Sequence, residues 1–203
     1  MEREDVAYFM RRLYEQRLTT TSGGNVSLRV GEKVLITPSQ TDKASVKQEQ
    51  IGDISIDGKI LTVGFKSSME SKMHLAIYNK RSDVNAVVHA HPVFATSFAI
   101  AGKEIKTNLA GEARAVLGEP VKARYALMGT QKLADVVAEV SLDGNVILME
   151  NHGVIAVGKN LLEAYDRMEV LEVSAKMTFI TDFLGGGKEL SKEELKSIDN
   201  LFE

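Results

Sequence analysis

Apolar residues near the N-terminus recur at helical spacing. Between residues 3 and 17, Val6 is followed three and four positions later by Phe9 and Met10, and these by Leu13 and Tyr14. This pattern predicts a surface helix with one buried stripe. The following segment, TTTSGGNVSLRV, starts with small polar residues and then alternates between apolar and polar positions. Together with the short apolar run KVLITPS, it predicts a loop followed by a β-hairpin.

The middle of the chain predicts two strands, a helix and a further strand. Residues 52–63 form two short strands joined at Asp57-Gly58, since Asp-Gly favours a tight turn. The segment KSSMESKMHLAIYNKR predicts a helix that starts near residue 67. The side chains expected to face inward from it are Met69, Met73, Ala76 and Ile77. NAVVHAH then predicts a strand, which Pro92 ends while opening the next helix.

The last third of the chain continues the mixture of strands and helices. VKARYAL predicts a strand, GTQKLADVVAEV a helix, and NVILMENHGVIAVG two apolar strands around a polar turn. LLEAYDRMEVLEVSAKMTFITDFL predicts a long helix. After the GGG at 185–187, SKEELKSIDNLF predicts a short charged helix. The whole pattern indicates an α/β fold in which helices pack against a sheet.

Composition narrows the class of protein. With 203 residues, 44% of them hydrophobic, the chain can bury one substantial core, so residues 1–203 are expected to form a single domain. The net charge of −3 comes from interspersed charges, which argues against a nucleic-acid partner. No apolar run reaches the length of a membrane span, and the charged N-terminus does not resemble a signal peptide. We therefore expect a soluble, cytoplasmic protein.

Three of the four histidines lie in segments that predict strand ends or turns. His89 and His91 share one face of a predicted strand because alternate side chains point to the same side. His152 lies in a turn, where Gly153 is expected to let the backbone change direction. The chain has no cysteine, so a metal site must use nitrogen and oxygen. Three imidazoles would leave one position open for water or substrate, as in catalytic zinc sites.

Less specific interpretations of these residues remain open. A His-x-His pair alone is a weak metal signal, and His74 is expected to pack in the core or to support the site. Glu70 follows a hydroxyl-rich helix start, where the helix dipole by itself favours a glutamate. The loop TTTSGGNVS, with TPS at 37–39 and SS at 67–68, suits a phosphate bound by backbone N–H groups and hydroxyls rather than by lysine. It also fits an ordinary hairpin entry.

Five ordered motifs give the chain a family resemblance. SGGNVSLR, LITPS, SSMESKMH, VVHAHP and ENHGVIAVG follow one another as in the class II aldolase/adducin family, and the chain most closely resembles its L-fuculose phosphate aldolase branch. The resemblance implies a three-layer α/β/α sandwich with a mostly antiparallel central sheet. It also implies a homotetramer with active sites between subunits. Charge and hydropathy, in turn, predict no nucleic-acid or membrane partner.

The resemblance further implies specific roles for residues of this chain. Zn²⁺ or another divalent metal, one per subunit, would be bound by His89, His91 and His152. Glu70 would be the catalytic acid/base and could also contact the metal. The phosphate of a sugar-phosphate substrate would be bound around Gly24, Asn25, Ser39, Ser67 and Ser68. The implied reaction cleaves a ketose 1-phosphate, such as L-fuculose 1-phosphate, into dihydroxyacetone phosphate and an aldehyde through a metal-stabilised enediolate.

The chain also departs from the family pattern. Met69 stands where relatives often have a second serine. No tyrosine occurs in KTNLAGEA or at Phe202-Glu203, where the fuculose enzymes place groups that protonate the aldehyde, although Tyr125 offers a phenol elsewhere. Alternatives within the fold are a sugar-phosphate epimerase, a methylthioribulose phosphate dehydratase and an adducin-like interaction module without metal. A zinc hydrolase would also suit an open three-histidine site.

Overall fold

Seven strands form one mixed sheet in the computed structural model, which describes residues 1–201. The strands are β1 (Asn25–Val30), β2 (Lys33–Ile36), β3 (Gly52–Ser55), β4 (Ala86–Ala90), β5 (Val121–Ala123), β6 (Val146–Met149) and β7 (Gly153–Gly158). Their order in the sheet is β3-β2-β1-β4-β7-β6-β5. All neighbours pair antiparallel except β5 and β6, which are parallel. The predicted α/β class and mostly antiparallel sheet are confirmed.

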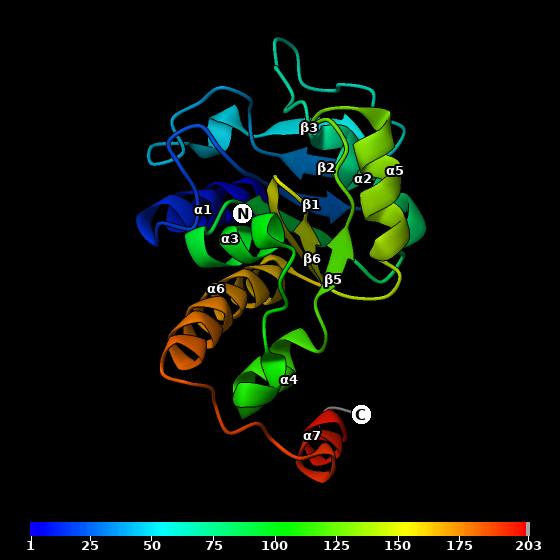
Figure 1. The fold of residues 1–203 in the computed structure, drawn as a ribbon. Helices are drawn as coiled ribbons and strands as arrows, with labels where there is room; N and C mark the ends of the chain where they lie inside the picture. The colour runs from blue at the N-terminus through cyan, green and yellow to red at the C-terminus, as the bar shows by residue number, and fades with distance from the viewer. Residues whose placement is uncertain (202–203) are drawn as a thin grey trace.

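Helices cover both faces of this sheet (Figure 1). They are α1 (Glu2–Glu15), α2 (Ser71–Lys80), α3 (Val93–Ala101), α4 (Gly111–Leu117), α5 (Gln131–Val140), α6 (Leu161–Phe183) and α7 (Lys192–Asp199). Two short 3-10 helices, η1 (Gln48–Gln50) and η2 (Thr107–Leu109), lie in connections. Val88 packs in the core shared with α1, α3 and α6, whereas its neighbour Val87 packs in the core shared with α2 and α5. This alternation along β4 is the period-2 pattern of a strand buried on both faces.

The structure corrects several of the predicted elements. In the second half of 52–63 only an isolated bridge between Ile54 and Ile60 forms, and VKARYAL contributes only the three residues of β5. Helix α2 starts at Ser71 rather than at Ser67, so Met69 lies outside the helix and is 67% exposed instead of facing inward. Helix α4 was not predicted, because its seven residues are too few for a periodic pattern.

The C-terminal helix α7 lies apart from the sheet (Figure 1). It contacts α4, where Arg114 forms a two-point ion pair with Asp199 at 2.7 and 2.8 Å. The predicted helix over 191–202 is therefore confirmed from residue 192 to residue 199, whereas Phe202 and Glu203 lie outside the described residues. None of the helices within residues 1–201 combines the length and apolar composition needed to cross a membrane.

Candidate metal centre and pocket

Three imidazoles converge at the centre of the sheet. His89 lies in β4 and pairs with Asn25 of β1 and Ile155 of β7, while His91 follows the end of β4 and His152 lies in the turn between β6 and β7. The ring centroid of His89 lies 4.7 Å from that of His91 and 5.0 Å from that of His152. One nitrogen from each ring lies within 4.8 Å of the others. The predicted convergence is confirmed, and sheet pairing explains it, because β7 joins β4 and carries the turn with it.

The ring nitrogens fit a divalent ion. The Nδ1–H of His89 donates to the Val154 carbonyl at 2.9 Å, which leaves Nε2 with a lone pair. This Nε2 is buried, and its close polar neighbour is the Glu70 carboxylate at 3.2 Å, while Nδ1 of His152 is buried with no hydrogen-bond partner among the described residues. A buried polar atom without a partner costs free energy, and coordination to a cation would remove that cost. Burial and the neighbouring histidines lower the pKa of His91 to about 3, so its ring stays neutral, as a ligand must be.

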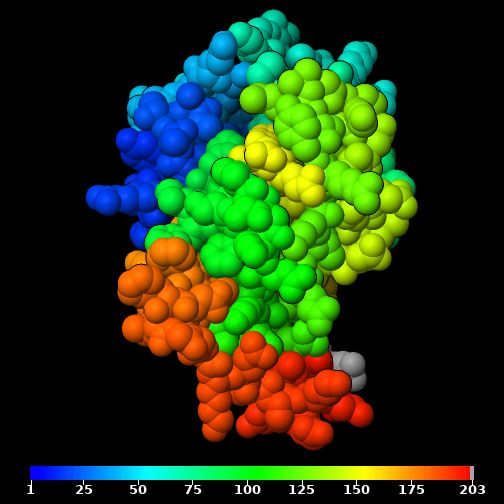
Figure 2. Space-filling model, viewed as in Figure 1, coloured from blue at the N-terminus to red at the C-terminus, as the bar shows by residue number. Residues whose placement is uncertain are grey.

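The turn that carries His152 differs from the sequence-based expectation. Asn151, with a φ of 53°, takes the left-handed conformation that reverses the chain, and Gly153 has no positive φ. Gly153 is needed for a different reason: a Cβ there would lie 2.5 Å from Cδ2 of His91 and 2.7 Å from the Ala90 carbonyl oxygen. Figure 2 shows the chain near residue 150, in yellow, reaching the surface between the green segments of α3 and α5. The turn thus borders the solvent on one side and the histidines on the other.

Glu70 lies between two of the histidines. Its carboxylate oxygens are 3.2 Å from Nε2 of His89 and 2.9 Å from Nε2 of His152. Burial alone would raise the pKa of the Glu70 carboxyl, but the charges of His89 and His152 and their contacts outweigh it and hold this pKa below its usual range. Burial opposes a rise in the pKa of His89, yet the Glu70 carboxylate raises it overall. The Glu70 carboxyl is therefore held in its ionised form by the two histidines.

The local fold explains why the Glu70 side chain can reach the histidines. Glu70 is the N-cap residue of α2, but its side chain makes no capping hydrogen bond. Instead its Oε2 accepts a hydrogen bond from Nδ2 of Asn25 at 2.8 Å. The same amide nitrogen donates to the hydroxyl of Ser68 at 3.2 Å. The simple dipole explanation for a glutamate at this position therefore does not account for its contacts.

A buried chain of hydrogen bonds fixes the side chain of Asn25 on the interior side. Its Oδ1 can only accept, so Nε2 of His74 donates to it at 2.5 Å, and Nδ1 of His74 then accepts from the hydroxyl of Ser27 at 2.7 Å. Ser27 also contacts the hydroxyl of Tyr78 at 2.7 Å. Burial lowers the pKa of His74 to about 3, so the ring is neutral as this chain requires. The prediction that His74 supports the site rather than binding metal agrees with its contact to Asn25.

A cavity of about 380 Å³ opens beside the histidines. Its walls include Gly24, Asn25, Ser39 and Ser68 of the predicted phosphate loops, together with Glu70, His91 and His152. Ser67 is not part of this wall and borders a separate hollow near Asp57 and Lys72. Gly24, with a φ of 68°, brings its loop against β4, because a Cβ there would lie 2.7 Å from the His89 carbonyl oxygen. Folding thus brings four of the five predicted phosphate residues into one cavity with His91 and His152.

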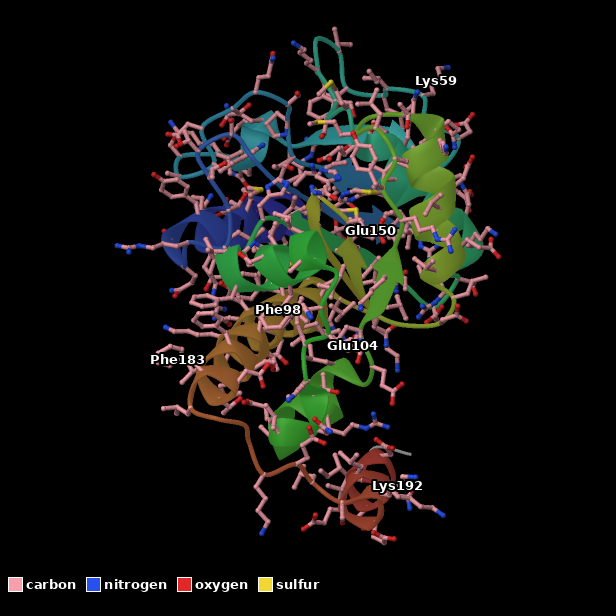
Figure 3. The ribbon with its side chains drawn as sticks, viewed as in Figure 1. Lys59, Phe98, Glu104, Glu150, Phe183 and Lys192 are labelled. Carbon is pink, nitrogen blue, oxygen red and sulfur yellow. The ribbon has the colours of Figure 1, made fainter. Side chains whose placement is uncertain are left out.

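Two features of the pocket were missed from the sequence. Lys43 and Met128 also line it, although no motif marked either residue. Lys43 is 1% exposed, and its Nζ donates to the Pro38 carbonyl at 2.8 Å. Tyr125, considered as a source of a phenol, does not line the cavity and is 57% exposed. Its backbone N–H donates to Glu150 at the end of β6, a residue labelled in Figure 3.

Sequence comparisons relate this chain to a protein family and to several named enzymes. Residues 4–179 match the family described as Class II Aldolase and Adducin N-terminal domain. An L-fuculose phosphate aldolase of Methanocaldococcus jannaschii is 35% identical over 89% of this chain and 97% of its own. A 5-deoxy-D-ribulose 1-phosphate aldolase of Bacillus thuringiensis serovar kurstaki is 33% identical over 100% of this chain and 95% of its own. A 3-oxo-tetronate 4-phosphate decarboxylase of Haemophilus influenzae is 30% identical over 98% of this chain and 96% of its own.

The fold agrees with the sequence relationship. A solved structure described as L-fuculose 1-phosphate aldolase superposes with a TM-score of 0.92 at 30% identity, over 99% of this chain and 95% of its own. The match spans both faces of the sheet and the segments that carry His89, His91 and His152. The chain belongs to the class II aldolase and adducin family.

Proposed function

We propose that the protein is a divalent-metal-dependent aldolase that reversibly cleaves a ketose 1-phosphate into dihydroxyacetone phosphate and an aldehyde. The observation that carries this proposal is the contact of Glu70 with both His89 and His152 beside a cavity lined by Gly24, Asn25 and other residues of the phosphate loops. An acid/base group, a metal-type donor set and an anion site within one pocket suit proton movement next to a carbonyl.

Different side chains of the pocket would bind the phosphate, move the proton and contact the aldehyde. Asn25 and Ser68, with the Gly24 and Ser39 segments, would hold the phosphate and so fix the three-carbon unit in the pocket. The Glu70 carboxylate, which its lowered pKa keeps ionised, would take the proton from the hydroxyl-bearing carbon in the condensation direction. It would return that proton after cleavage. Met69 and Met128 would give the pocket rim an apolar wall for the aldehyde.

The proposed metal ligands are His89, His91 and His152. Zn²⁺ or another divalent ion bound there would act as a Lewis acid that stabilises negative charge on the carbonyl oxygen of the substrate. Glu70 contacts Nε2 of His89 and Nε2 of His152, the two nitrogens that face the carboxylate. Because the carboxylate approaches these nitrogens, Glu70 would either join the donor set or move when substrate binds.

Decarboxylation of a 3-oxo sugar-acid phosphate is the second candidate, since a relative with that name covers nearly the whole chain. Aldol cleavage and decarboxylation both leave an electron pair on a carbon next to a carbonyl, so one site can serve either reaction. The epimerase and dehydratase alternatives remain chemically compatible with the same pocket. A binding module without metal is less favoured, because all three imidazoles converge.

The deciding experiment is a condensation assay. Metal-loaded protein is incubated with dihydroxyacetone phosphate and a panel of aldehydes, L-lactaldehyde among them, and new ketose phosphate is measured. A parallel incubation with 3-oxo sugar-acid phosphates measures released CO₂. We expect condensation with at least one aldehyde. Release of CO₂ without any condensation would replace the aldolase with the decarboxylase.

The remaining parts of the proposal concern assembly and setting. We propose a single domain over residues 1–203 with the three-layer arrangement of the family, supported by the continuous sheet, and a homotetramer with active sites at subunit interfaces. Exposed apolar side chains near the end of α6 support assembly, and Figure 3 labels one of them, Phe183, which is 85% exposed. Light scattering should then give a mass near four times 22.3 kDa. A cytoplasmic setting suits a charged sugar-phosphate substrate.

A further inference from the structure

Lys43 is a buried cation that the proposed chemistry does not yet use. The residue is 1% exposed and lies on the segment after β2, whose backbone is tied to the glycine loop by a hydrogen bond from the Lys43 N–H to the Thr21 carbonyl at 2.9 Å. Its ammonium has three protons to donate. Within residues 1–201 the Pro38 carbonyl is the single hydrogen-bond acceptor at Nζ, and no carboxylate lies within ion-pair distance. The charge is therefore only partly satisfied.

Lys43 is part of the wall of the cavity that contains the predicted phosphate residues. It borders the cavity together with Gly24, Asn25, Ser39 and Ser68, all of them neutral. Among the described residues of the wall, Lys43 is the only lysine or arginine. A phosphate group carries nearly two negative charges and would enter a protein whose own net charge is −3. With neutral donors alone, no lysine or arginine of the described wall would balance that charge next to the Glu70 carboxylate.

Burial also makes Lys43 costly in the absence of an anion. Desolvation lowers the pKa of Lys43 to about 8, and the Glu70 carboxylate offsets this only in part. A buried ammonium is unfavourable unless an anion pairs with it. A lysine that merely anchors the Pro38 carbonyl would be replaceable by a neutral donor at lower cost. The energetic penalty is explained if an anionic ligand completes the site.

We propose that Lys43 supplies the positive charge of the anion site and so selects phosphorylated over unphosphorylated substrates. The inference rests on the proposed function for the position of the phosphate, but the charge argument holds for any phosphate monoester in this pocket. It adds a residue that composition and motifs did not suggest, because the sequence favoured a phosphate bound without lysine.

The test compares anion binding with turnover in two variants and one control. Inorganic phosphate is titrated into metal-loaded wild type, Lys43→Met, Lys43→Arg and Lys47→Met by calorimetry. Lys47 is exposed on the same segment and serves as the matched control. We expect phosphate affinity to fall about ten- to a hundredfold in Lys43→Met, as for loss of a charged hydrogen bond. Lys47→Met should match wild type and Lys43→Arg should retain part of the affinity.

The second readout separates charge from structure. KM is measured for dihydroxyacetone phosphate and for unphosphorylated dihydroxyacetone with the same aldehyde. Lys43→Met should raise KM for the phosphorylated donor by about tenfold or more and change kinetics with dihydroxyacetone less than twofold. Equal losses for both donors, or unchanged phosphate affinity, would overturn the inference. Lys43→Gln, which keeps a donor for Pro38, replaces the Met variant if circular dichroism shows that variant unfolded. If wild type condenses neither donor, the proposed function fails while the calorimetry still decides the role of Lys43.

Discussion

At the scale of single residues, the carboxylate of Glu70 is the group that we propose moves the proton. It contacts Asn25, His89 and His152, and its pKa lies below the usual range. A glutamine keeps the shape and the hydrogen bond to Asn25 but cannot accept a proton. Glu70→Gln should therefore lower kcat by about 10²- to 10⁴-fold while metal content stays near normal. Steady-state kinetics and elemental analysis measure the two quantities.

The controls for this variant isolate the role of the carboxylate. His91→Ala should lose both metal and activity, whereas Glu139→Gln, whose side chain is 65% exposed on α5, should change neither. Activity above about a tenth of wild type in Glu70→Gln would show that another group moves the proton.

His74 gives a residue-scale prediction for stability against pH. Its pKa is about 3 in the fold and 6.5 in the unfolded chain, because burial disfavours the charged ring. The unfolded chain therefore binds more protons between these values, so stability is lost as pH falls below 6.5. Between pH 6.5 and about pH 4.5 this group alone should lower the free energy of unfolding by about 2 kcal/mol. Urea unfolding of metal-free protein at several pH values measures the loss.

Comparison with His74→Gln separates this contribution from those of other groups. Glutamine can still donate to Asn25 but does not titrate, so the variant should lose less stability than wild type over the same pH range. Identical pH dependence in the two proteins would mean that His74 does not titrate on unfolding. The variant also tests whether His74 holds the Asn25 side chain in place, since Nε2 of His74 lies 2.5 Å from Oδ1 of Asn25.

At the scale of secondary structure elements, the close approach of β4 to the β6–β7 turn forms the proposed metal centre. Gly153 has no room for a Cβ, which would lie 2.5 Å from the ring of His91. Gly153→Ala should force the turn away from His91, costing about 1–3 kcal/mol of stability and weakening metal binding. Thermal unfolding and metal titration measure both effects.

Gly111→Ala is the matched control for this variant. Its added Cβ would lie 3.7 Å from Ile198, which is an ordinary contact, at the start of α4. It should leave metal affinity unchanged. Should Gly153→Ala bind metal as tightly as wild type, the contact with His91 would not determine the geometry of the site.

Local sequence patterns predicted some of the helices and strands correctly and misplaced others. Long periodic segments such as α6 and alternating strands such as β1 were predicted because local spacing reports burial directly. The start of α2 was misplaced, because Ser67 and Ser68 resemble caps although the chain there pairs with Pro38 in an isolated bridge. Only tertiary contacts to another loop decide between these two conformations.

At the scale of the whole molecule, a metal ion would connect segments far apart in the chain. His89 and His91 lie beside β4, while His152 lies in the β6–β7 turn. An ion that binds the folded state alone stabilises it by mass action. Zinc at about 100 times its Kd should therefore raise the free energy of unfolding by about 2.7 kcal/mol. Differential scanning calorimetry, with a chelator to reverse the shift, measures this gain.

His152→Ala provides the control, because it removes one donor while leaving His89 in β4 and His91 just after it. The variant should show little zinc-dependent stabilisation. A full shift in that variant would place the bound zinc at some other site and would leave the three-histidine centre without support.

The sequence by itself determined the α/β class and, through the order of its motifs, marked His89, His91, His152 and Glu70 as candidates, because strand alternation and motif order can be read along the chain. Tertiary structure alone decided which loops border the cavity. It placed Ser67 outside that wall and brought Lys43 into it, and it joined His74 to Asn25. The reason is physical: pairing of β1, β4 and β7 fixes distances between residues that no local periodicity relates, and burial then sets their charge states.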